Sequence, residues 1–372
     1  MKRVIVGMSG GVDSSVAALL LKKQGYEVIG IYLKYSNIYN KCTCTCTCTC
    51  TCRVDAMLVS QTLKIKFYII DISKIYKKKI IKYIYKEYRK GFTPNPDILC
   101  NSKIKFKIFL EKLIDLKSDF IATGHYVIKK EIFENGKIYY QIKSGIDQNK
   151  DQSYFLCKLN QNQIKKSLFP LGNLTKKEVR QIASKYHLIN AKKKDSQGIC
   201  FIGKIKFFNF LKLKLKKKEG SIIEINSENS KKEDGKIIGK HIGAHFFTKG
   251  QRKGLKIGGY KFPLFVIEKD IKNNILYVGM GKNHPGLYTK VVLIKKQNIH
   301  WINPNWINPN HDFFKKEVKC RIRYRQKLQK ATLYKKKNKI YVEFEIPQLA
   351  VNAGQFIVWY INNEVIGSGR IG

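Results

Sequence analysis

The chain has 372 residues, 44% of them hydrophobic, which is typical of a globular protein with two or three domains. No apolar run approaches the roughly 20 residues of a membrane span, and "MKRVIVGMSGG" at the N-terminus has no signal-peptide pattern. We therefore expect a cytoplasmic protein without membrane contact, in which cysteines are normally reduced.

The net charge of +45 favours a polyanionic partner. However, 63 of the 72 basic residues are lysine, and the codons of the abundant Lys, Ile and Asn are A/T-rich, so this charge is weak evidence. The arginines are more informative, because Arg321, Arg323 and Arg325 fall together in "CRIRYRQ". Two interpretations remain open here: guanidinium contacts to RNA, or the basic solvent face of a β-strand.

Residues 1–200 alternate between strand and helix patterns. Strands are predicted at 3–8, 27–33, 66–72 and 119–127, and helices at 14–24, near 54–64 and in the lysine-rich stretch after 72. "TKKEVRQIASKYHL" opens with a capping box, since Thr175 stands three residues before Glu178. Strands separated by helices predict an α/β fold with a parallel sheet.

The pattern changes after about residue 203. A lysine-rich helix is predicted at 206–218. Short β-type runs follow at 221–225, 236–247, 264–270, 275–280, 290–294, 317–325, 339–345, 355–362 and 364–369. This spacing predicts small β-domains or barrels. The tandem repeat "WINPNWINPN" at 301–310 is interpreted as a duplicated loop without function.

Six of the ten cysteines alternate with threonine in "KCTCTCTCTCTC", residues 41–52. Zinc ligands usually come as C-x₂₋₄-C pairs. C-x-C spacing suits thiolate clusters, or places the sulfurs on one side of an extended segment. We interpret the run as an expanded repeat in a surface loop, dispensable for function, with a metal-binding segment as the alternative.

"MSGGVDSS", residues 8–15, is the strongest local signal. It follows an apolar strand and precedes a helix, where backbone N–H groups and the helix dipole form an anion site. It lacks the lysine of a Walker A loop and resembles the pyrophosphate loop of enzymes that cleave ATP to AMP and pyrophosphate. The alternative is a plain glycine-rich turn. "GSGRIG" at 367–372 fits G-x-G-x-x-G but has no helix after it, so we reject it.

Two further cysteines lie in distinctive contexts. In "TPNPDILCN" (93–101), two prolines hold the chain extended and bring Asp97 and Cys100 together. In "DSQGICFIG" (195–203), Cys200 follows a run of lysines, which lowers the pKa of a thiol. Taken singly, either cysteine is more often a small buried apolar residue than a reactive one.

Seven motifs together resemble the bacterial tRNA-specific 2-thiouridylase family, in order and over nearly the whole chain. They are "GMSGGVDSS", "TPNPDILCN", "ATGHY", "KDQSYFL", "KKKDSQGICFIG", "TKGQRKGL" and "RYRQ". The resemblance implies a HUP-like pyrophosphate-loop domain at 1–203, a small central domain at 204–268 and a tRNA-binding C-terminal β-barrel at 269–372. The sequence departs from the family around 36–52.

The resemblance also implies an activity, ATP-dependent 2-thiolation of the wobble uridine in tRNA. ATP adenylates the C2 oxygen, and a cysteine persulfide then supplies sulfur. ATP and Mg²⁺ are the expected cofactors. The expected partners are the tRNAs for Lys, Glu and Gln and a protein that donates persulfide sulfur.

Site residues follow by the same resemblance. Cys200 carries the persulfide, Cys100 assists sulfur release or closes a disulfide with Cys200, and Asp97 acts as acid or base near the uracil. The ATP positions are Gly7, Met8, Ser9, Gly10, Gly11, Val12, Asp13, Ser14, Leu33 (often Met in the family) and Gly124. The tRNA positions are Asn95, Pro96, Asp97, His125, Lys150, Asp151, Gln152, Arg323, Tyr324 and Gln355. No metal ligands are assigned.

Two alternatives remain. An amidotransferase-linked ligase that cleaves ATP in the same way uses ammonia and needs no cysteine pair. A non-catalytic RNA-binding or metal-storing protein releases no pyrophosphate, and its metal content follows the cysteine run.

Overall fold

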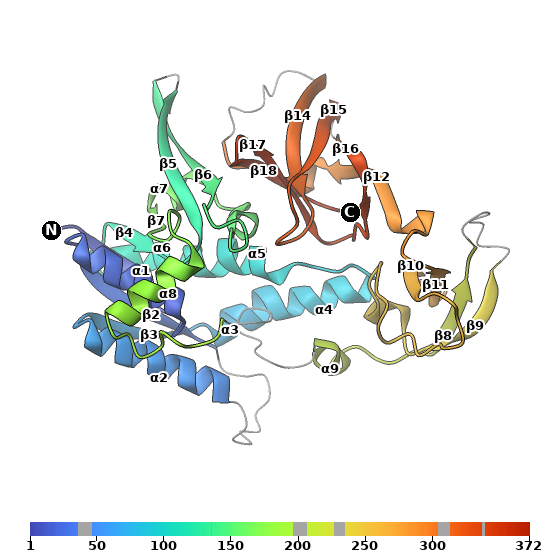
Figure 1. Cartoon of the computed structure of the whole chain (residues 1–372), viewed down its shortest axis with the longest axis horizontal. Helices are drawn as coiled ribbons and strands as arrows, with labels where there is room; N and C mark the ends of the chain where they lie inside the picture. Colours follow the sequence, from blue (N-terminus) through green and yellow to red (C-terminus); the bar gives the residue numbers. More distant parts are fainter. Residues whose placement is uncertain (36–46, 135, 196–206, 227–234, 304–312, 337–338) are drawn as a thin grey trace.

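The computed structural model describes residues 1–35, 47–134, 136–195, 207–226, 235–303, 313–336 and 339–372. Its strands form three sheets (Figure 1). A parallel sheet lies at the end that carries the N-terminus, and a four-stranded sheet lies at the opposite end. A nine-stranded sheet lies above the helices that run between them.

The parallel sheet confirms the predicted α/β class. Its order is β3-β2-β1-β4-β7, and all four pairings are parallel. The strands are β1 (Arg3–Gly7), β2 (Glu27–Lys34), β3 (Lys66–Asp71), β4 (Phe120–Ala122) and β7 (Ser167–Leu168). Val4, Ile5 and Val6 of β1 are fully buried, because helices cover both faces of a parallel sheet.

The helices of this half mostly pack around the sheet, and some run from it towards the four-stranded sheet (Figure 1). They are α1 (Val12–Lys23), α2 (Thr47–Thr62), α3 (Ser73–Tyr76), the π-helix η1 (Lys77–Ile81), α4 (Lys82–Arg89), α5 (Pro96–Cys100), the π-helix η2 (Asn101–Lys105), α6 (Phe106–Asp115), the 3₁₀ turn η3 (Ser153–Leu156), α7 (Gln161–Lys165) and α8 (Lys176–Lys185). Thr175 and Glu178 form the predicted capping box on α8. No helix of the described part of the chain is long and apolar enough to cross a membrane.

Helix α2 corrects the interpretation of the cysteine run as a surface loop. The helix begins at Thr47, so the second half of the run is helical rather than a loop. Threonine and cysteine have low intrinsic helix propensity, which is why the sequence pattern placed the start near residue 54. Packing of α2 against the sheet overrides that preference. Residues 36–46, with Cys42, Cys44 and Cys46, lie outside the described residues.

The predicted strand at 119–127 was wrong in its extent. β4 ends at Ala122, and β5 (Val127–Glu134) turns away to form an antiparallel hairpin with β6 (Lys137–Ser144). In Figure 1 this hairpin rises away from the parallel sheet. β6 pairs with β18 (Glu364–Arg370), so the hairpin extends the nine-stranded sheet.

The two remaining sheets confirm the predicted β-domains. α9 (Phe207–Lys212) is shorter than predicted, since crowded lysines disfavour its continuation. Then come β8 (Gly220–Glu224), β9 (Lys236–His241), β10 (Leu264–Asp270) and β11 (Ile275–Met280), in the order β10-β11-β8-β9. The proposed domain boundary at 268/269 falls within β10, which pairs with β11.

The nine-stranded sheet holds the remaining strands. They are β12 (Tyr288–Lys295), β13 (Ile299–Trp301), β14 (Phe313–Arg321), β15 (Gln329–Lys336), β16 (Lys339–Leu349), β17 (Phe356–Ile361) and β18, with the hairpin β5–β6. The sequence analysis did not predict β15, because the lysines of this strand obscure the alternation of apolar and polar residues. The repeat at 301–310 lies largely outside the described residues.

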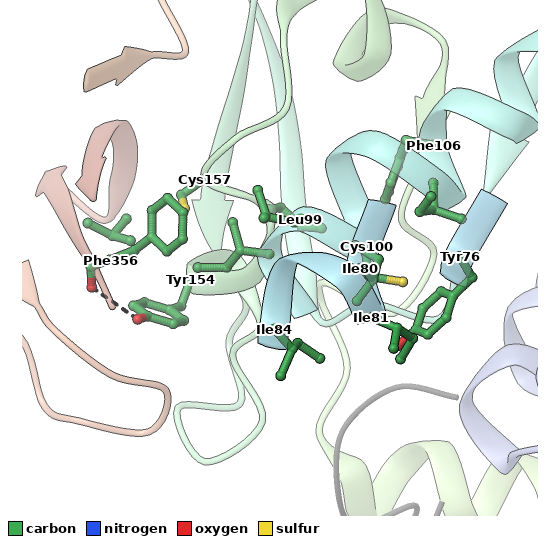
Figure 2. Packing of buried hydrophobic residues seen from close by; sticks show 14 of the residues in the cluster. Tyr76, Ile80, Ile81, Ile84, Leu99, Cys100, Phe106, Tyr154, Cys157 and Phe356 are labelled. Carbon is green, nitrogen blue, oxygen red and sulfur yellow. Dashed lines mark hydrogen bonds between the residues drawn. The ribbon is translucent and has the colours of Figure 1, made fainter. Parts of the chain in front are cut away.

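One hydrophobic cluster runs through the α/β half and both β-sheets. It includes Cys100 of α5, Tyr154 of η3 and Phe356 of β17 (Figure 2). Because the sheets share this core, segments that are distant in sequence are held in fixed positions around α5.

Candidate active site

The loop between β1 and α1 has the conformation that an anion site requires. Gly10 has φ +72°, and a Cβ there would lie 2.0 Å from the carbonyl oxygen of Cys52. Glycine is therefore needed at this position for both backbone conformation and space. Gly124, just after β4, is also tightly packed, since a Cβ there would lie 2.8 Å from the amide nitrogen of Ser14.

Serine hydroxyls hold the loop in this shape. The Ser14 hydroxyl accepts from the Ser9 amide and donates to the Gly11 carbonyl, both at 3.1 Å. Gly11 caps α1 without a side-chain hydrogen bond. The first-turn amides of a helix have no intrahelical acceptor, and the helix dipole adds positive potential there. The loop can therefore bind a phosphate group through backbone donors.

A charge network borders the start of α1. Asp13 Oδ1 accepts from the Tyr126 hydroxyl at 2.7 Å and from Lys176 Nζ at 2.6 Å. Lys176 also pairs with Asp195 at 2.8 Å, and Asp195 pairs further with Lys150 and Arg180. Burial raises the pKa of Asp195, but the hydrogen bonds from Lys150 and Lys176 outweigh it and lower this pKa to about 2. Sequence reasoning missed Tyr126 and Lys176, because only the fold brings them to the loop.

A second lysine contacts the loop from the other side. Lys193 Nζ donates to the Gly10 carbonyl at 3.0 Å, pairs with Asp55 and lies 3.3 Å from Cys52 Sγ. Burial opposes the charge of Lys193, but its contacts with Asp55 and Cys52 outweigh this and raise its pKa. The last cysteine of the Thr-Cys run thus borders the predicted ATP loop, a contact that no pattern in the sequence predicts.

Leu33 also lies near this loop. It is a buried residue of β2, two positions after Ile31, whose carbonyl accepts from the Met8 amide at 2.8 Å.

Cys100 is buried at the C-terminal end of α5. Asn95 caps this helix by accepting from the Ile98 amide at 3.4 Å, and Pro96 occupies its first turn. Cys100 is fully buried, and Figure 2 shows its sulfur among Ile80, Ile81 and Tyr76. Asp97, on the same short helix, is half-buried.

The predicted partner of Cys100 cannot be placed. Cys200 lies in 196–206, outside the described residues. No disulfide joins two of the described cysteines. The pairing of Cys100 with Cys200 therefore stays a prediction.

His125 and Gln152 lie beside the loop after β4. His125 Nδ1 is 2.7 Å from Thr123 Oγ1, and its ring stacks on Phe106. Burial, with a smaller contribution from the Lys105 charge, lowers the pKa of His125 to about 3, so the imidazole is neutral near pH 7. Gln152 accepts from the Tyr126 amide at 3.1 Å.

The C-terminal predicted residues reach the same region. Gln355 donates to the Thr93 carbonyl at 2.8 Å, and the Tyr324 ring lies 4.5 Å from Phe155. Arg323 and Arg325 are exposed, and Arg325 lies over Tyr324.

Two of the charged residues are buried. Arg321, from the arginine cluster, and Asp151, predicted to contact tRNA, form a buried ion pair at 2.9 Å. The arginine cluster is therefore partly exposed to solvent and partly interior.

Three family profiles match the chain. A profile described as tRNA methyl transferase HUP domain matches residues 2–204. One described as tRNA methyl transferase PRC-barrel domain matches 208–280, and one described as Aminomethyltransferase beta-barrel domain matches 296–371. These matches confirm a HUP-like domain followed by a central barrel and a C-terminal barrel.

Curated relatives match the whole chain. The tRNA-specific 2-thiouridylase MnmA of Karelsulcia muelleri (strain GWSS) is 73% identical, over 100% of this chain and 98% of that protein. The proteins of the same name from Christiangramia forsetii and Flavobacterium johnsoniae are 47% and 48% identical, over 100% of both chains in each case. Among solved structures, NMN synthetase from Francisella tularensis is 17% identical with a TM-score of 0.35, over 56% of this chain and 72% of that one, which is too distant to support an inference.

Proposed function

Because this chain belongs to the tRNA-specific 2-thiouridylase family, we propose that it is a tRNA sulfurtransferase that uses ATP to replace the C2 oxygen of the wobble uridine with sulfur. The observation that supports this proposal most directly is the loop Met8–Gly11 between β1 and α1. It contains a glycine in the left-handed conformation, and no side chain in the described part of the protein caps the helix that follows it. Such a loop binds the pyrophosphate part of ATP.

The C2 carbonyl of uridine is amide-like, so its oxygen leaves poorly. In the proposed first step this oxygen attacks the α-phosphorus of ATP, the bond to the pyrophosphate breaks, and AMP becomes attached to the uracil. The amides of α1 and the charges of Lys176 and Lys193 favour pyrophosphate as the leaving group. Oxygen then leaves as part of AMP, which is a good leaving group.

Mg²⁺ fits the donor chemistry of this loop. Asp13 supplies a carboxylate beside the phosphate-binding amides, and magnesium is usually held by one or two carboxylates together with substrate phosphates. Asp13 would hold the ion, which would neutralise phosphate charge when bound. Tyr126 and Lys176 orient the carboxylate on Oδ1.

Sulfur transfer is proposed to involve Cys200 and Cys100. The terminal sulfur of a Cys200 persulfide, loaded by a donor protein, attacks C2 and displaces AMP. The Cys100 thiolate then attacks Cys200 Sγ, which breaks the bond to the transferred sulfur and leaves a Cys100–Cys200 disulfide and 2-thiouridine. A thiol reductant must reduce that disulfide before the next turnover. Because Cys100 is fully buried, this step takes place away from bulk solvent.

Asp97 and neutral His125 are the proposed groups near the uracil. Asp97 shares α5 with Cys100 and exchanges the proton on N3 of the base, while Asn95 and Pro96 shape its surroundings. Lys150, Gln152, Arg323, Tyr324 and Gln355 are proposed to contact the tRNA around it. Tyr324 offers an aromatic face for a base, as in other RNA sites.

The test is mass spectrometry of nucleosides from tRNA of cells with and without this protein. Wobble 2-thiouridine should be present only with it, and the purified protein should release pyrophosphate and AMP. Production of ADP and phosphate would contradict the proposed chemistry. Pyrophosphate release that is intact in Cys100→Ser, with no 2-thiouridine formed by the wild-type protein, would favour an ammonia-using ligase instead.

A further inference from the structure

We infer that Asp151 and Arg321 are positioning residues that do not touch RNA. Their buried ion pair fixes the C-terminal sheet against the 150–156 segment. It thereby sets the spacing between the two groups of proposed tRNA contacts, one in each of these segments. This inference rests on the proposed function. It gives Asp151 a different role from the tRNA contact expected from the sequence, and it separates Arg321 from its neighbours Arg323 and Arg325.

Both side chains lie inside the protein. The side chain of Asp151 is 3% exposed and that of Arg321 is 7% exposed, and Nη2 of Arg321 lies 2.9 Å from Oδ2 of Asp151. The Arg321 Nε is shielded from solvent and has no acceptor within the described part of the chain. A phosphate group cannot reach either charge without dismantling the interface, because solvent itself barely reaches them.

Hydrogen bonds occupy the Asp151 carboxylate. Oδ1 accepts from the amides of Ser153 and Gly145, at 3.0 and 3.4 Å. Oδ2 accepts from the Ser153 hydroxyl at 3.1 Å as well as from Arg321. A carboxylate with this many protein donors already has the partners that a buried charge requires.

The contacts close a ring across the two domains. The Ser153 hydroxyl lies 3.1 Å from the Tyr360 hydroxyl of β17, and the Arg321 guanidinium lies 4.9 Å from the centroid of the Tyr360 ring. We call Asp151, Ser153, Arg321 and Tyr360 the domain clamp. Two of its members come from each side of the interface.

The neighbouring Tyr154 supports the same junction. Its hydroxyl donates to the Phe356 carbonyl at 3.0 Å and contacts the Ile322 carbonyl at 3.2 Å, and Figure 2 shows the bond to Phe356. Tyr154 is fully buried. The junction thus fixes the backbone directly after Arg321, at the end of β14, and at the start of the neighbouring strand β17.

The clamp stands directly between residues proposed to contact tRNA. Lys150 and Gln152 flank Asp151 in the chain, and Arg323 and Tyr324 follow Arg321 by two and three residues. Phe155 and Tyr324 meet across the same interface. Removing one charge leaves the other buried and uncompensated, which should let the two groups of RNA contacts move apart.

Salt dependence of tRNA binding distinguishes positioning from direct contact. A residue that neutralises an RNA phosphate adds roughly 0.7–0.9 to the slope of log affinity against log salt. We compare Arg321→Met with Arg323→Gln. Arg323→Gln should lower the slope by that amount. Arg321→Met should weaken binding roughly two- to thirty-fold, the range typical of coupling through a network, and lower the slope by less than Arg323→Gln does.

Hydrogen exchange without RNA tests the clamp independently of tRNA binding. Arg321→Met and Asp151→Asn should each speed exchange at Ser153–Leu156 and Phe356–Ile361. The double variant should lose little more protection from exchange than the more strongly affected single variant. If Arg321→Met does not fold, Arg321→Lys, which keeps the charge, replaces it as the test variant. It should speed exchange in the same two segments, but by a smaller amount.

The outcomes separate the two proposals. A slope that falls equally in Arg321→Met and Arg323→Gln would overturn the inference, as would unchanged hydrogen exchange. If wild-type protein binds a tRNA substrate no better than an unrelated RNA of equal length, the proposed function fails, while faster exchange would still show that the clamp joins the domains.

Discussion

The proposed ATP loop and the proposed tRNA surface of this protein are built in different ways. The loop is one continuous stretch, Gly7–Ser14, in which glycine, serine hydroxyls and a helix start provide most of the site. The tRNA surface joins segments from both ends of the chain, through contacts such as Gln355 to Thr93 and Tyr324 to Phe155. Damage to the loop should therefore act locally, whereas the tRNA surface should respond to changes in its supporting interfaces.

The largest effect should come from Cys100, which lies in the region that is assembled from both ends of the chain. Cys100→Ser should abolish thiolation, because no second thiol would then release the sulfur. Cys157→Ser is the matched control, since Cys157 is also fully buried in the same cluster and burial raises its pKa to about 12. Cys200→Ser should likewise abolish thiolation. Nucleoside mass spectrometry measures the product, and activity in Cys100→Ser would remove the proposed relay.

The loop itself should be nearly as sensitive. Gly10→Ala should reduce pyrophosphate release by roughly a hundredfold or more, since the methyl group would displace the loop from Cys52 and misalign its phosphate donors. Gly25→Ala provides the control, because Gly25 has a similar positive φ of +84° but nothing within 4 Å of its Cβ position. Equal losses in both variants would mean that backbone strain alone explains the effect.

A moderate effect is expected at the tRNA surface. Replacing Arg323 by Gln and Tyr324 by Ala should weaken tRNA binding by roughly tenfold or more, since stacking and phosphate contacts are each worth about 1–3 kcal/mol. The comparison is Lys78, Lys82 and Lys86 replaced together by Gln, on the exposed face of η1 and α4. Gel-shift or anisotropy titrations compare the two, and equal losses would indicate a general basic surface.

A small effect is expected from the Thr-Cys run. Replacing Cys42, Cys44, Cys46, Cys48 and Cys50 by Ser should leave thiolation unchanged. Adding Cys52→Ser should keep thiolation but change the KM for ATP by a few-fold, because Cys52 contacts Lys193 beside the loop. Loss of thiolation in the fivefold variant would make the run a sulfur carrier.

Stability, rather than activity, should respond to pH through His125. The folded protein holds this imidazole neutral down to a pKa of about 3, whereas the unfolded chain binds a proton below about pH 6.5. The free energy of unfolding should therefore fall as pH drops from 6.5 towards 3, by at most about 1.4 kcal/mol per pH unit from this group. His125→Gln should flatten that dependence in urea titrations, and the exposed His187→Gln should not.

The sequence alone was sufficient to predict a feature when one continuous stretch contained both the motif and its flanking secondary-structure pattern. The strand–"GMSGG"–helix pattern, the capping box at Thr175 and the β-rich second half were all predicted on local grounds. Periodicity could not reveal that β4 ends at Ala122, because nothing in the short stretch after it shows that Val127 begins a hairpin that packs elsewhere. Tyr126, Lys176 and Lys193 reach the loop only through tertiary packing, and burial of Arg321 depends on Asp151 far away in the chain.

The hairpin β5–β6 has a consequence for the synthesis of this protein. Its inner strand β6 pairs with β18, and the Gln141–Glu364 hydrogen bond joins residues 223 positions apart. On the ribosome, β6 is made long before its partner, so its backbone edge stays open while most of the chain is translated. An open edge strand is a site for association with other chains. The exposed lysines on this hairpin, such as Lys130 and Lys137, carry positive charge that opposes aggregation during that interval.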